Sequence, residues 1–284
     1  MRIAVTASLV APLVDPPIGG AQAFVCDLAT ALQERGHEVT VYCSAGSSWP
    51  ELRLAQIPVD PAVSAALVHP GGAPAAPVPA LREAFTREFE AVRAAAPDAV
   101  SQHAFDADAI ELAEDLPVLH TLHLPPLVPG VVEAARASRA RFVTVSEAAR
   151  RAWREAGLAE VGVIPNGVPD LEPPGPAPVE PVALIAGRVS PEKGTAAALR
   201  AASEVGLRPQ LAGEIFDREY WERSIRLPTQ ALRRRDLSRL MARAAVTLMP
   251  VEWDEPFGLV AAEAQLAGCP VAGYRRGGDR KSVV

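Results

Sequence analysis

Short apolar runs alternate with amphipathic stretches from the start of the chain. Ile3–Ser8 is a β-type apolar run, Gln22–Arg35 repeats apolar residues at the helical period, and Val39–Cys43 is apolar again. The glycine pair Gly19-Gly20 precedes the expected helix, and Gly36 follows it as a stop signal. This strand–helix–strand opening predicts a doubly wound α/β domain.

The alternation continues to residue 167. Ser146 suits the N-cap of a helix through Ala156, because its hydroxyl can accept from a free N–H of the first turn. Asp60–Pro79 is rich in Pro, Ala and Gly and predicts a loop. The remaining expected elements of this half are a helix at Leu81–Ala95 and strands at Ala99–Gln102, Val118–His123, Phe142–Val145 and Val161–Ile164, with helical segments between them.

A proline-rich segment separates this half from a second α/β pattern. Residues 168–181 contain six prolines in fourteen positions, which excludes a helix or a central strand and predicts a stiff linker. We therefore expect two Rossmann-like domains, 1–167 and 182–284, facing across a cleft that binds a ligand at the strand C-terminal ends. The second domain is expected to contain, in order, Val182–Ala186 (strand), Gly187–Gly194 (loop), Thr195–Val205 (helix), Gln210–Ala212 (strand), Arg239–Ala244 (helix), Ala245–Met249 (strand), Leu259–Ala267 (helix) and Val271–Gly273 (strand).

Composition narrows the class of protein. The chain has 284 residues, 49% of them hydrophobic, and a net charge of −6, which argues against a nucleic-acid partner. The three cysteines form no Cys-x-x-Cys pair, which fits a reducing cytoplasm rather than a disulfide framework or zinc site. We see no signal peptide and no apolar run of the ~18 residues that a membrane span needs. Peripheral contact with the inner membrane face is left open.

The strongest chemical signal is a pair of carboxylates around an expected helix start. Glu255 and Glu263 are eight residues apart, with Gly258 between them where the helix begins. The free N–H groups and the dipole of a helix N-terminus favour a phosphate, and the two carboxylates can accept from sugar and ribose hydroxyls. The alternative is a helix with ordinary surface carboxylates.

A second signal is the basic loop at 187–194. Arg188 offers a planar fork for phosphate oxygens and Lys193 a compact charge, while Gly187 and Gly194 allow tight turns. Taken alone, such a loop is usually a solvated surface.

Two further signals are weak by themselves. Gly19-Gly20 could bring backbone N–H groups close to a phosphate, but a lone Gly-Gly is more often a turn. His120 and His123 are three residues apart near a strand end and so face opposite ways, which allows one to be buried while the other lines the cleft. The chain has no Gly-x-Gly-x-x-Gly fingerprint, which argues against the alternative of a nicotinamide dehydrogenase.

Taken in order, these segments resemble family 4 glycosyltransferases of the GT-B fold. The resemblance runs from about residue 1 to residue 278. The segments that carry it are Gly19-Gly20-Ala21-Gln22, Gly36-His37-Glu38-Val39, His120-Thr121-Leu122-His123, Val143-Thr144-Val145-Ser146, Ile164-Pro165-Asn166-Gly167-Val168, the loop at 187–194 and the Glu-x7-Glu segment at 255–263.

The resemblance implies roles in the second domain. Glu255 would contact the donor sugar hydroxyls and Glu263 the ribose. Arg188 and Lys193 would bind the diphosphate and stabilise the charge of the leaving group. The backbone at Phe257, Gly258 and Leu259 would also contact the donor at the helix start.

In the first domain the resemblance implies that Gly19 and Gly20 lie under the donor phosphate and His123 beside the sugar. Asn166 would shape the hinge. The family transfers a sugar from a nucleoside-diphosphate sugar with retained anomeric configuration and usually without a catalytic metal, so we expect no cofactor and no metal site. The acceptor is left open among saccharides, lipids and small molecules. The alternative is a fragment that binds sugar nucleotides without turnover.

The chain departs from the family pattern at two places. Between Tyr220 and Leu237 the family has more chain, including a strand, so the sheet order of the second domain is open. After Gly278 the family continues with further helices, and we interpret the second domain as truncated. The tail at 279–284 is what the codons GAT CGG AAG AGC GTC GTG encode, which resemble a common sequencing adapter, so we interpret it as non-native.

Overall fold

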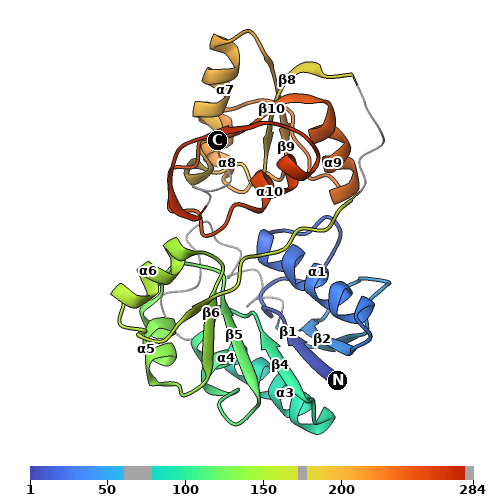
Figure 1. Ribbon diagram of the computed structural model, residues 1–284, viewed down its shortest axis with the longest axis vertical. Coiled ribbons are helices and arrows are strands. Elements are labelled where there is room, and N and C mark those ends of the chain that lie inside the picture. The colour runs from blue at the N-terminus through green and yellow to red at the C-terminus, as the bar shows by residue number, and fades with distance from the viewer. Residues whose placement is uncertain (61–78, 172–177, 279–284) are drawn as a thin grey trace. The chain divides into compact units, whose positions relative to one another are not determined.

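The computed structural model describes residues 1–60, 79–171 and 178–278. The chain divides into two compact units, Met1–Gly167 and Val168–Val284 (Figure 1). Most of the loop expected at Asp60–Pro79, the centre of the expected linker and the six-residue tail lie outside the described residues.

The first unit is built on a seven-stranded parallel sheet. Its strand order is β3-β2-β1-β4-β5-β6-β7, and the direction of winding reverses between β1 and β4. In such sheets the C-terminal strand ends beside the reversal are the usual ligand site. The strands are β1 (Arg2–Thr6), β2 (Glu38–Ser44), β3 (Leu54–Ile57), β4 (Ala99–Gln102), β5 (Val118–Leu122), β6 (Arg141–Thr144) and β7 (Gly162–Val163).

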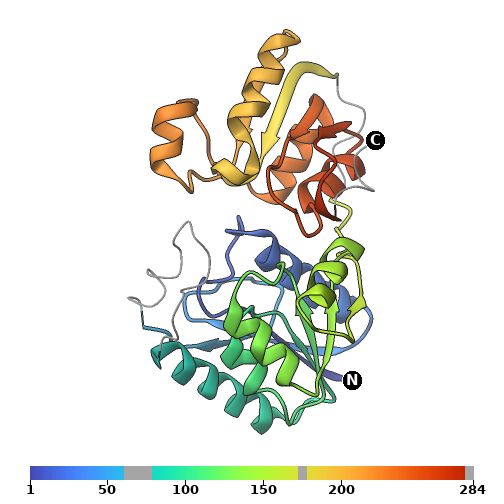
Figure 2. The same ribbon diagram turned by 90° about the vertical axis from the view of Figure 1, so that its left-hand side faces the viewer.

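Helices cover both faces of this sheet, which makes the fold doubly wound (Figure 1, Figure 2). α1 (Gly20–Glu34) packs on the face that carries Val5 and Val41, and α3 (Pro79–Ala95) packs on the opposite face. The other helices of this unit are α4 (Ala107–Glu111), α5 (Pro129–Ala137) and α6 (Glu147–Glu155).

The second unit has a four-stranded parallel sheet in the order β11-β10-β8-β9. One cluster of buried residues joins the sheet to α9 and α10, and another joins it to α7 and α8. The elements are β8 (Glu180–Ala186), the 3-10 turn η1 (Pro191–Lys193), α7 (Thr195–Glu204), β9 (Arg208–Ala212), α8 (Arg218–Ser224), α9 (Arg234–Arg243), β10 (Ala244–Met249), α10 (Leu259–Leu266) and β11 (Val271–Gly273).

Most expected elements are present, with ends that differ by a few residues. The Ser146 hydroxyl accepts from Ala149 N at 3.1 Å, so this residue is the N-cap of α6 as expected. Two elements, β3 and α8, were not anticipated, and α9 begins at Arg234 rather than at Arg239. The strand order of the second sheet, which the sequence left open, places β9 at one edge. The helix α8 follows β9 in the chain.

No helix among the described residues has the length and apolar character needed to cross a bilayer.

Candidate functional site

Gly194 allows the basic loop at 187–194 to pack directly against the backbone that follows β10. Gly194 has φ +67°, and a Cβ there would lie 1.9 Å from the carbonyl oxygen of Pro250. A side chain would therefore need a left-handed backbone and would also collide with main chain. A backbone hydrogen bond joins the same two loops, since Glu252 N donates to Glu192 O at 2.8 Å.

This packing brings two predicted site residues together. Lys193 Nζ lies 2.6 Å from Glu255 Oε2, and the indole Nε1 of Trp253 donates to the same oxygen at 2.8 Å. Lys193 also stands over the Trp253 ring, 5.4 Å from its centroid. The two charged side chains are 23% and 13% exposed, so they are partly shielded from water. A cation and a carboxylate are thus fixed at neighbouring strand ends.

Arg188, the second predicted phosphate ligand, follows β8. Its guanidinium lies 4.5 Å from the centroid of the Phe216 ring, a cation–π geometry, and 3.9 Å from Glu192 Oε1. The ring limits the conformations of the guanidinium while its side chain remains 36% exposed. Arg188 is therefore held at the end of the strand with surface left for an anion.

The Glu-x7-Glu segment forms the start of α10. Gly258 has φ +85° and is the N-cap, so the helix begins at Leu259 after a left-handed turn. Glu263, on the second turn, is paired with Arg234, whose Nη2 lies 2.5 Å from Glu263 Oε1. Both side chains are nearly buried, at 14% and 11% exposure. Glu263 is therefore an oriented carboxylate rather than an ordinary surface one.

In the first unit His123 follows β5 and is part of a chain of polar groups. Its Nε2 lies 2.9 Å from Nδ1 of His103, and Nε2 of His103 lies 2.9 Å from Ser101 Oγ. The Phe24 ring packs edge-on against both imidazoles, with centroid distances of 5.6 and 5.2 Å. His103 and His123 are buried.

Burial keeps these imidazoles uncharged. Desolvation lowers the pKa of His123 to about 4, and it lowers the pKa of His103 well below the usual 6.5, with further lowering from His123 and His120. His120 is also buried and stacks on Phe142, so the structure buries both histidines of the motif. Burial lowers its pKa to about 4 as well.

The glycine pair caps α1. Gly19 is the N-cap in extended conformation and Gly20 is the first helical residue, so the first N–H groups of α1 have no acceptor within the helix. Asn166, predicted to shape the hinge, has its Oδ1 buried without a hydrogen-bond partner among the described residues. The structure thus places each predicted residue, but the roles implied by the resemblance stay predictions.

Sequence reasoning missed four residues that hold the predicted ones: Phe216, Arg234, His103 and, as a hydrogen-bond donor, Trp253. One of them had a signal. His103 follows β4 as His123 follows β5, and adjacent parallel strands bring their following residues together. Arg234 lies in the segment between Tyr220 and Leu237 that departs from the family pattern, and Phe216 lies just before that segment. Neither residue carries a local signal for its contact.

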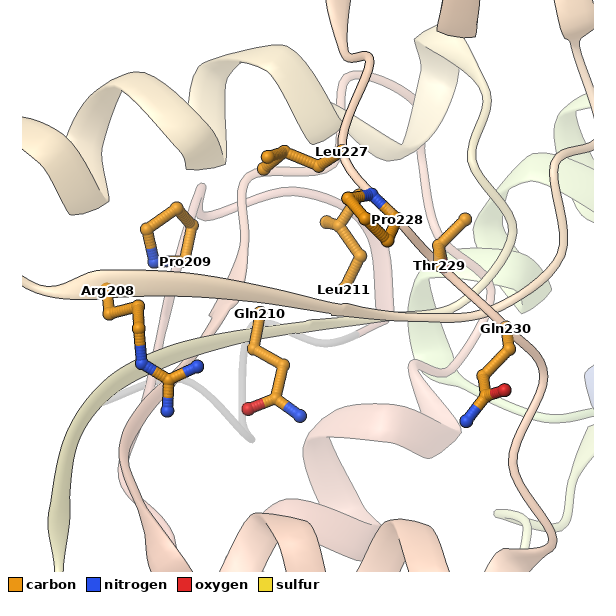
Figure 3. Close-up of a pocket in the computed structure, with 8 residues that line it drawn as sticks. All are labelled: Arg208, Pro209, Gln210, Leu211, Leu227, Pro228, Thr229 and Gln230. Atoms are coloured by element: carbon orange, nitrogen blue, oxygen red, sulfur yellow. The ribbon is translucent and has the colours of Figure 1, made fainter.

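A depression of about 370 Å³ lies along the edge strand β9 and is separate from these residues. Figure 3 shows Pro209 and Leu211 on one side of the strand and Arg208 and Gln210 on the other, with Leu227–Gln230 running alongside. We assign it no role in the donor site.

Comparison with known proteins decides the family. A model of Glycosyltransferase Family 4 matches residues 18–170, and a model of Glycosyl transferases group 1 matches residues 171–284. The chain belongs to glycosyltransferase family 4. It is therefore a transferase enzyme of two Rossmann-like domains in the GT-B fold.

Relatives of this glycosyltransferase support the assignment. A D-inositol 3-phosphate glycosyltransferase of Pseudarthrobacter chlorophenolicus is 27% identical over 99% of this chain and 81% of its own length. Two solved structures share the fold. AviGT4, a glycosyltransferase involved in avilamycin A biosynthesis, has a TM-score of 0.71 at 23% identity, over 99% of this chain and 80% of its own. HepE of Anabaena, in complex with UDP and glucose, has a TM-score of 0.70 at 18% identity, over 99% and 82%.

Proposed function

We propose that this glycosyltransferase takes a sugar from a nucleoside-diphosphate sugar and transfers it with retention of the anomeric configuration. The observation that carries the proposal is the contact between Lys193 and Glu255 at 2.6 Å. It sets a cation and a carboxylate at neighbouring strand ends, next to the helix N-terminus at Gly258. These are the groups that a diphosphate and a sugar hydroxyl need side by side.

The chemistry assigned to these residues is mainly electrostatic. As the bond to the anomeric carbon breaks, negative charge grows on the leaving diphosphate, and Lys193 and Arg188 would stabilise it. Glu255 would accept from sugar hydroxyls and Glu263 from the ribose. Preorganised contacts of this kind commonly contribute about 10²–10³-fold to rate.

The acceptor belongs to the same proposal. Because one relative is named as a D-inositol 3-phosphate glycosyltransferase, phosphorylated polyols should be screened first, followed by saccharides and lipids. The cytoplasmic location expected from cysteine usage, with or without peripheral membrane contact, likewise remains a proposal.

The test is binding followed by turnover. Thermal unfolding of the purified chain is measured with UDP, GDP and ADP, using Glu263→Ala as the control variant. A shift with one nucleotide that is lost in the variant identifies the donor base. NMR of the product formed from the matching α-linked donor then gives the anomeric configuration.

The product configuration, the turnover and the nucleotide binding each distinguish the proposed activity from an alternative. An α-linked product supports retention, and a β-linked product rejects it. Nucleotide binding without transfer or donor hydrolysis would favour the alternative, a chain that binds sugar nucleotides without turnover. A folded chain that binds no nucleotide would contradict the proposed donor site.

A further inference from the structure

Trp253 contacts both charged residues of the candidate site from the loop that follows β10. Its indole Nε1 donates to Glu255 Oε2 at 2.8 Å, and the centroid of its ring lies 5.4 Å from Lys193 Nζ. An indole N–H can only donate, so the direction of this hydrogen bond is fixed by the chemistry of the ring. The indole is also uncharged. Trp253 therefore holds the carboxylate without neutralising it.

The two oxygens of Glu255 have different surroundings. Oε2 accepts from Lys193 Nζ at 2.6 Å as well as from the indole. Oε1 has no hydrogen-bond partner in the part of the chain that the structure describes, and it is not among the fully buried atoms that lack one. A carboxylate can accept through both oxygens. Oε1 is therefore the oxygen left open to a hydroxyl.

The backbone that carries Trp253 and Glu255 is held in place. Glu255 N donates to Trp253 O at 3.0 Å, and Gly278 N donates to Glu255 O at 2.7 Å. Gly277 allows this close packing, because a Cβ there would lie 2.3 Å from Glu255 O. The Trp253 side chain packs against the buried cluster that joins the sheet to α9 and α10. The freedom that remains is mainly in the side chain of Glu255, where the indole acts.

Lys193 alone would hold the carboxylate less well. Its ammonium is a compact charge on a flexible stem, and the proposed function directs that charge to a diphosphate. An ammonium that turns toward phosphate loses part of its contact with Oε2. The indole has only two rotatable side-chain bonds and little to lose in ordering. It can keep Glu255 in place while Lys193 binds the ligand.

We infer that Trp253 is a positioning residue that anchors Oε2 of Glu255 and so leaves Oε1 to accept from a hydroxyl of the transferred sugar. That the hydroxyl belongs to a sugar rests on the proposed function. The anchoring of Oε2 by the indole does not.

The first measurement needs no substrate. The chain has four tryptophans, so ¹H–¹⁵N NMR resolves few indole N–H resonances, and Trp253→Phe identifies the one from Trp253. Glu255→Ala should move this proton resonance upfield, because the charged acceptor is lost. Asp254→Ala, which removes the exposed neighbouring carboxylate, should leave it in place. An unmoved resonance in Glu255→Ala, or an equal shift in both variants, overturns the inference.

Lys193→Ala shows whether the indole anchors the carboxylate independently. The inference expects the Trp253 indole resonance to stay at low field in this variant, since Nε1 still donates to Glu255. A shift as large as that in Glu255→Ala would mean that Lys193 alone orients the carboxylate, and it would overturn the inference.

The kinetic test removes only the indole N–H. Benzothienylalanine in place of Trp253 has sulfur where the N–H was and keeps the ring beside Lys193. With a donor that is turned over, kcat/KM should fall about 10–100-fold, the effect of losing one hydrogen bond to a charged group. The dissociation constant of the free nucleoside diphosphate, which has no sugar, should be unchanged. An unaltered kcat/KM, or an equal loss of nucleotide affinity, contradicts the positioning role.

Trp221→Phe is the matched control in the same unit. It removes an indole N–H that donates to Leu227 O at 3.0 Å, from a ring whose centroid lies 5.4 Å from the Arg218 guanidinium. The variant loses the same kind of contacts as Trp253→Phe but should keep kcat/KM. Trp253→Phe serves as the second variant if the benzothienylalanine protein does not fold. Equal losses of kcat/KM in the two phenylalanine variants would overturn the inference.

Glu255→Ala completes the cycle and separates this inference from the proposed function. In that background, removal of the Trp253 N–H should have no further effect on kcat/KM. The same fold loss in both backgrounds would mean that Trp253 acts independently of Glu255. If Glu255→Ala is slow and the benzothienylalanine protein is not, the positioning role fails and the proposed function stands. If Glu255→Ala keeps the wild-type kcat/KM, the role of Glu255 in the proposed function fails, and the indole resonance alone decides the anchoring.

Discussion

Lys193 Nζ and Glu255 Oε2 lie 2.6 Å apart, although 62 residues separate them in the chain. The loop after β8 and the loop after β10 meet at this ion pair. The indole Nε1 of Trp253 donates to the same oxygen of Glu255, and Lys193 Nζ lies over the Trp253 ring. Each charge holds the other in one orientation before any ligand arrives. Such preorganisation lowers the cost of ordering flexible side chains on binding.

Lys193→Ala should slow sugar transfer about 10²–10³-fold, because it removes a cation placed for the leaving diphosphate. Lys193→Arg should keep part of the rate, since charge is retained with a different shape. The measurement is kcat with the donor identified by nucleotide binding. Arg200→Ala, an exposed change on α7, is the matched control. Equal rates for Lys193→Ala and this control would reject the role of Lys193.

Glu263→Gln should reduce the preference for UDP over 2′-deoxy-UDP, or the equivalent pair for another base. The carboxylate predicted to accept from the ribose diol would become a weaker acceptor, and the deoxy ligand has already lost that hydroxyl. The measurement is the ratio of the two dissociation constants by calorimetry. Glu204→Gln, an exposed change on α7, should leave the ratio unaltered. The assignment fails if wild type and Glu263→Gln give the same ratio.

Arg234→Met tests the ion pair between Arg234 and Glu263. It leaves the nearly buried Glu263 without its guanidinium partner and should lower the free energy of unfolding by about 1–2 kcal/mol, less than for a fully buried pair. Urea unfolding measures this loss. Arg235→Met, which changes the exposed arginine next to Arg234, should have a smaller effect. An equal loss in both variants would mean that the pair does not stabilise the unit.

The elements that sequence predicts best are those with strong local signals. The strand at Ala99–Gln102 and the Ser146 cap are found as predicted, because apolar runs and a short hydroxyl side chain act locally. α8 was overlooked although Asp217 accepts from Tyr220 N at 2.8 Å as its N-cap. Most of α8 lies in the segment between Tyr220 and Leu237 that departs from the family pattern, where no resemblance directed attention to a helix.

The contacts within the candidate site could be predicted less well than its residues. The 187–194 loop and the Glu-x7-Glu segment were recognisable in sequence, but the pairing of Lys193 with Glu255 depends on which strands are neighbours. β8 and β10 are adjacent only because the intervening β9 moves to the sheet edge, a tertiary outcome that no local pattern encodes. Pairing of Glu263 with Arg234 depends in the same way on how α9 and α10 pack.

Glu88 gives a pH-dependent prediction. This α3 residue is fully buried, and both of its carboxylate oxygens lack a hydrogen-bond partner among the described residues. Burial, and secondarily the charge of Asp106, raises its pKa well above the usual 4.5. In the unfolded chain Glu88 loses its proton near the ordinary value, whereas the folded protein retains it to higher pH. The stability of the folded state is therefore reduced progressively as the pH rises above about 4.5 and through the folded pKa.

Glu88→Leu should remove this dependence. At pH 8 it should raise the free energy of unfolding by about 1–3 kcal/mol, because an unpartnered buried carboxyl is replaced by an apolar side chain of similar size. The gain should shrink toward pH 4.5, where the wild-type carboxyl is protonated in both states. Urea unfolding at pH 5, 6.5 and 8 measures the trend, with the exposed Glu83→Gln of the same helix as control. A gain that is the same at all three pH values would show that titration of Glu88 does not cause it, and a loss at pH 8 would show that the carboxylate stabilises the fold.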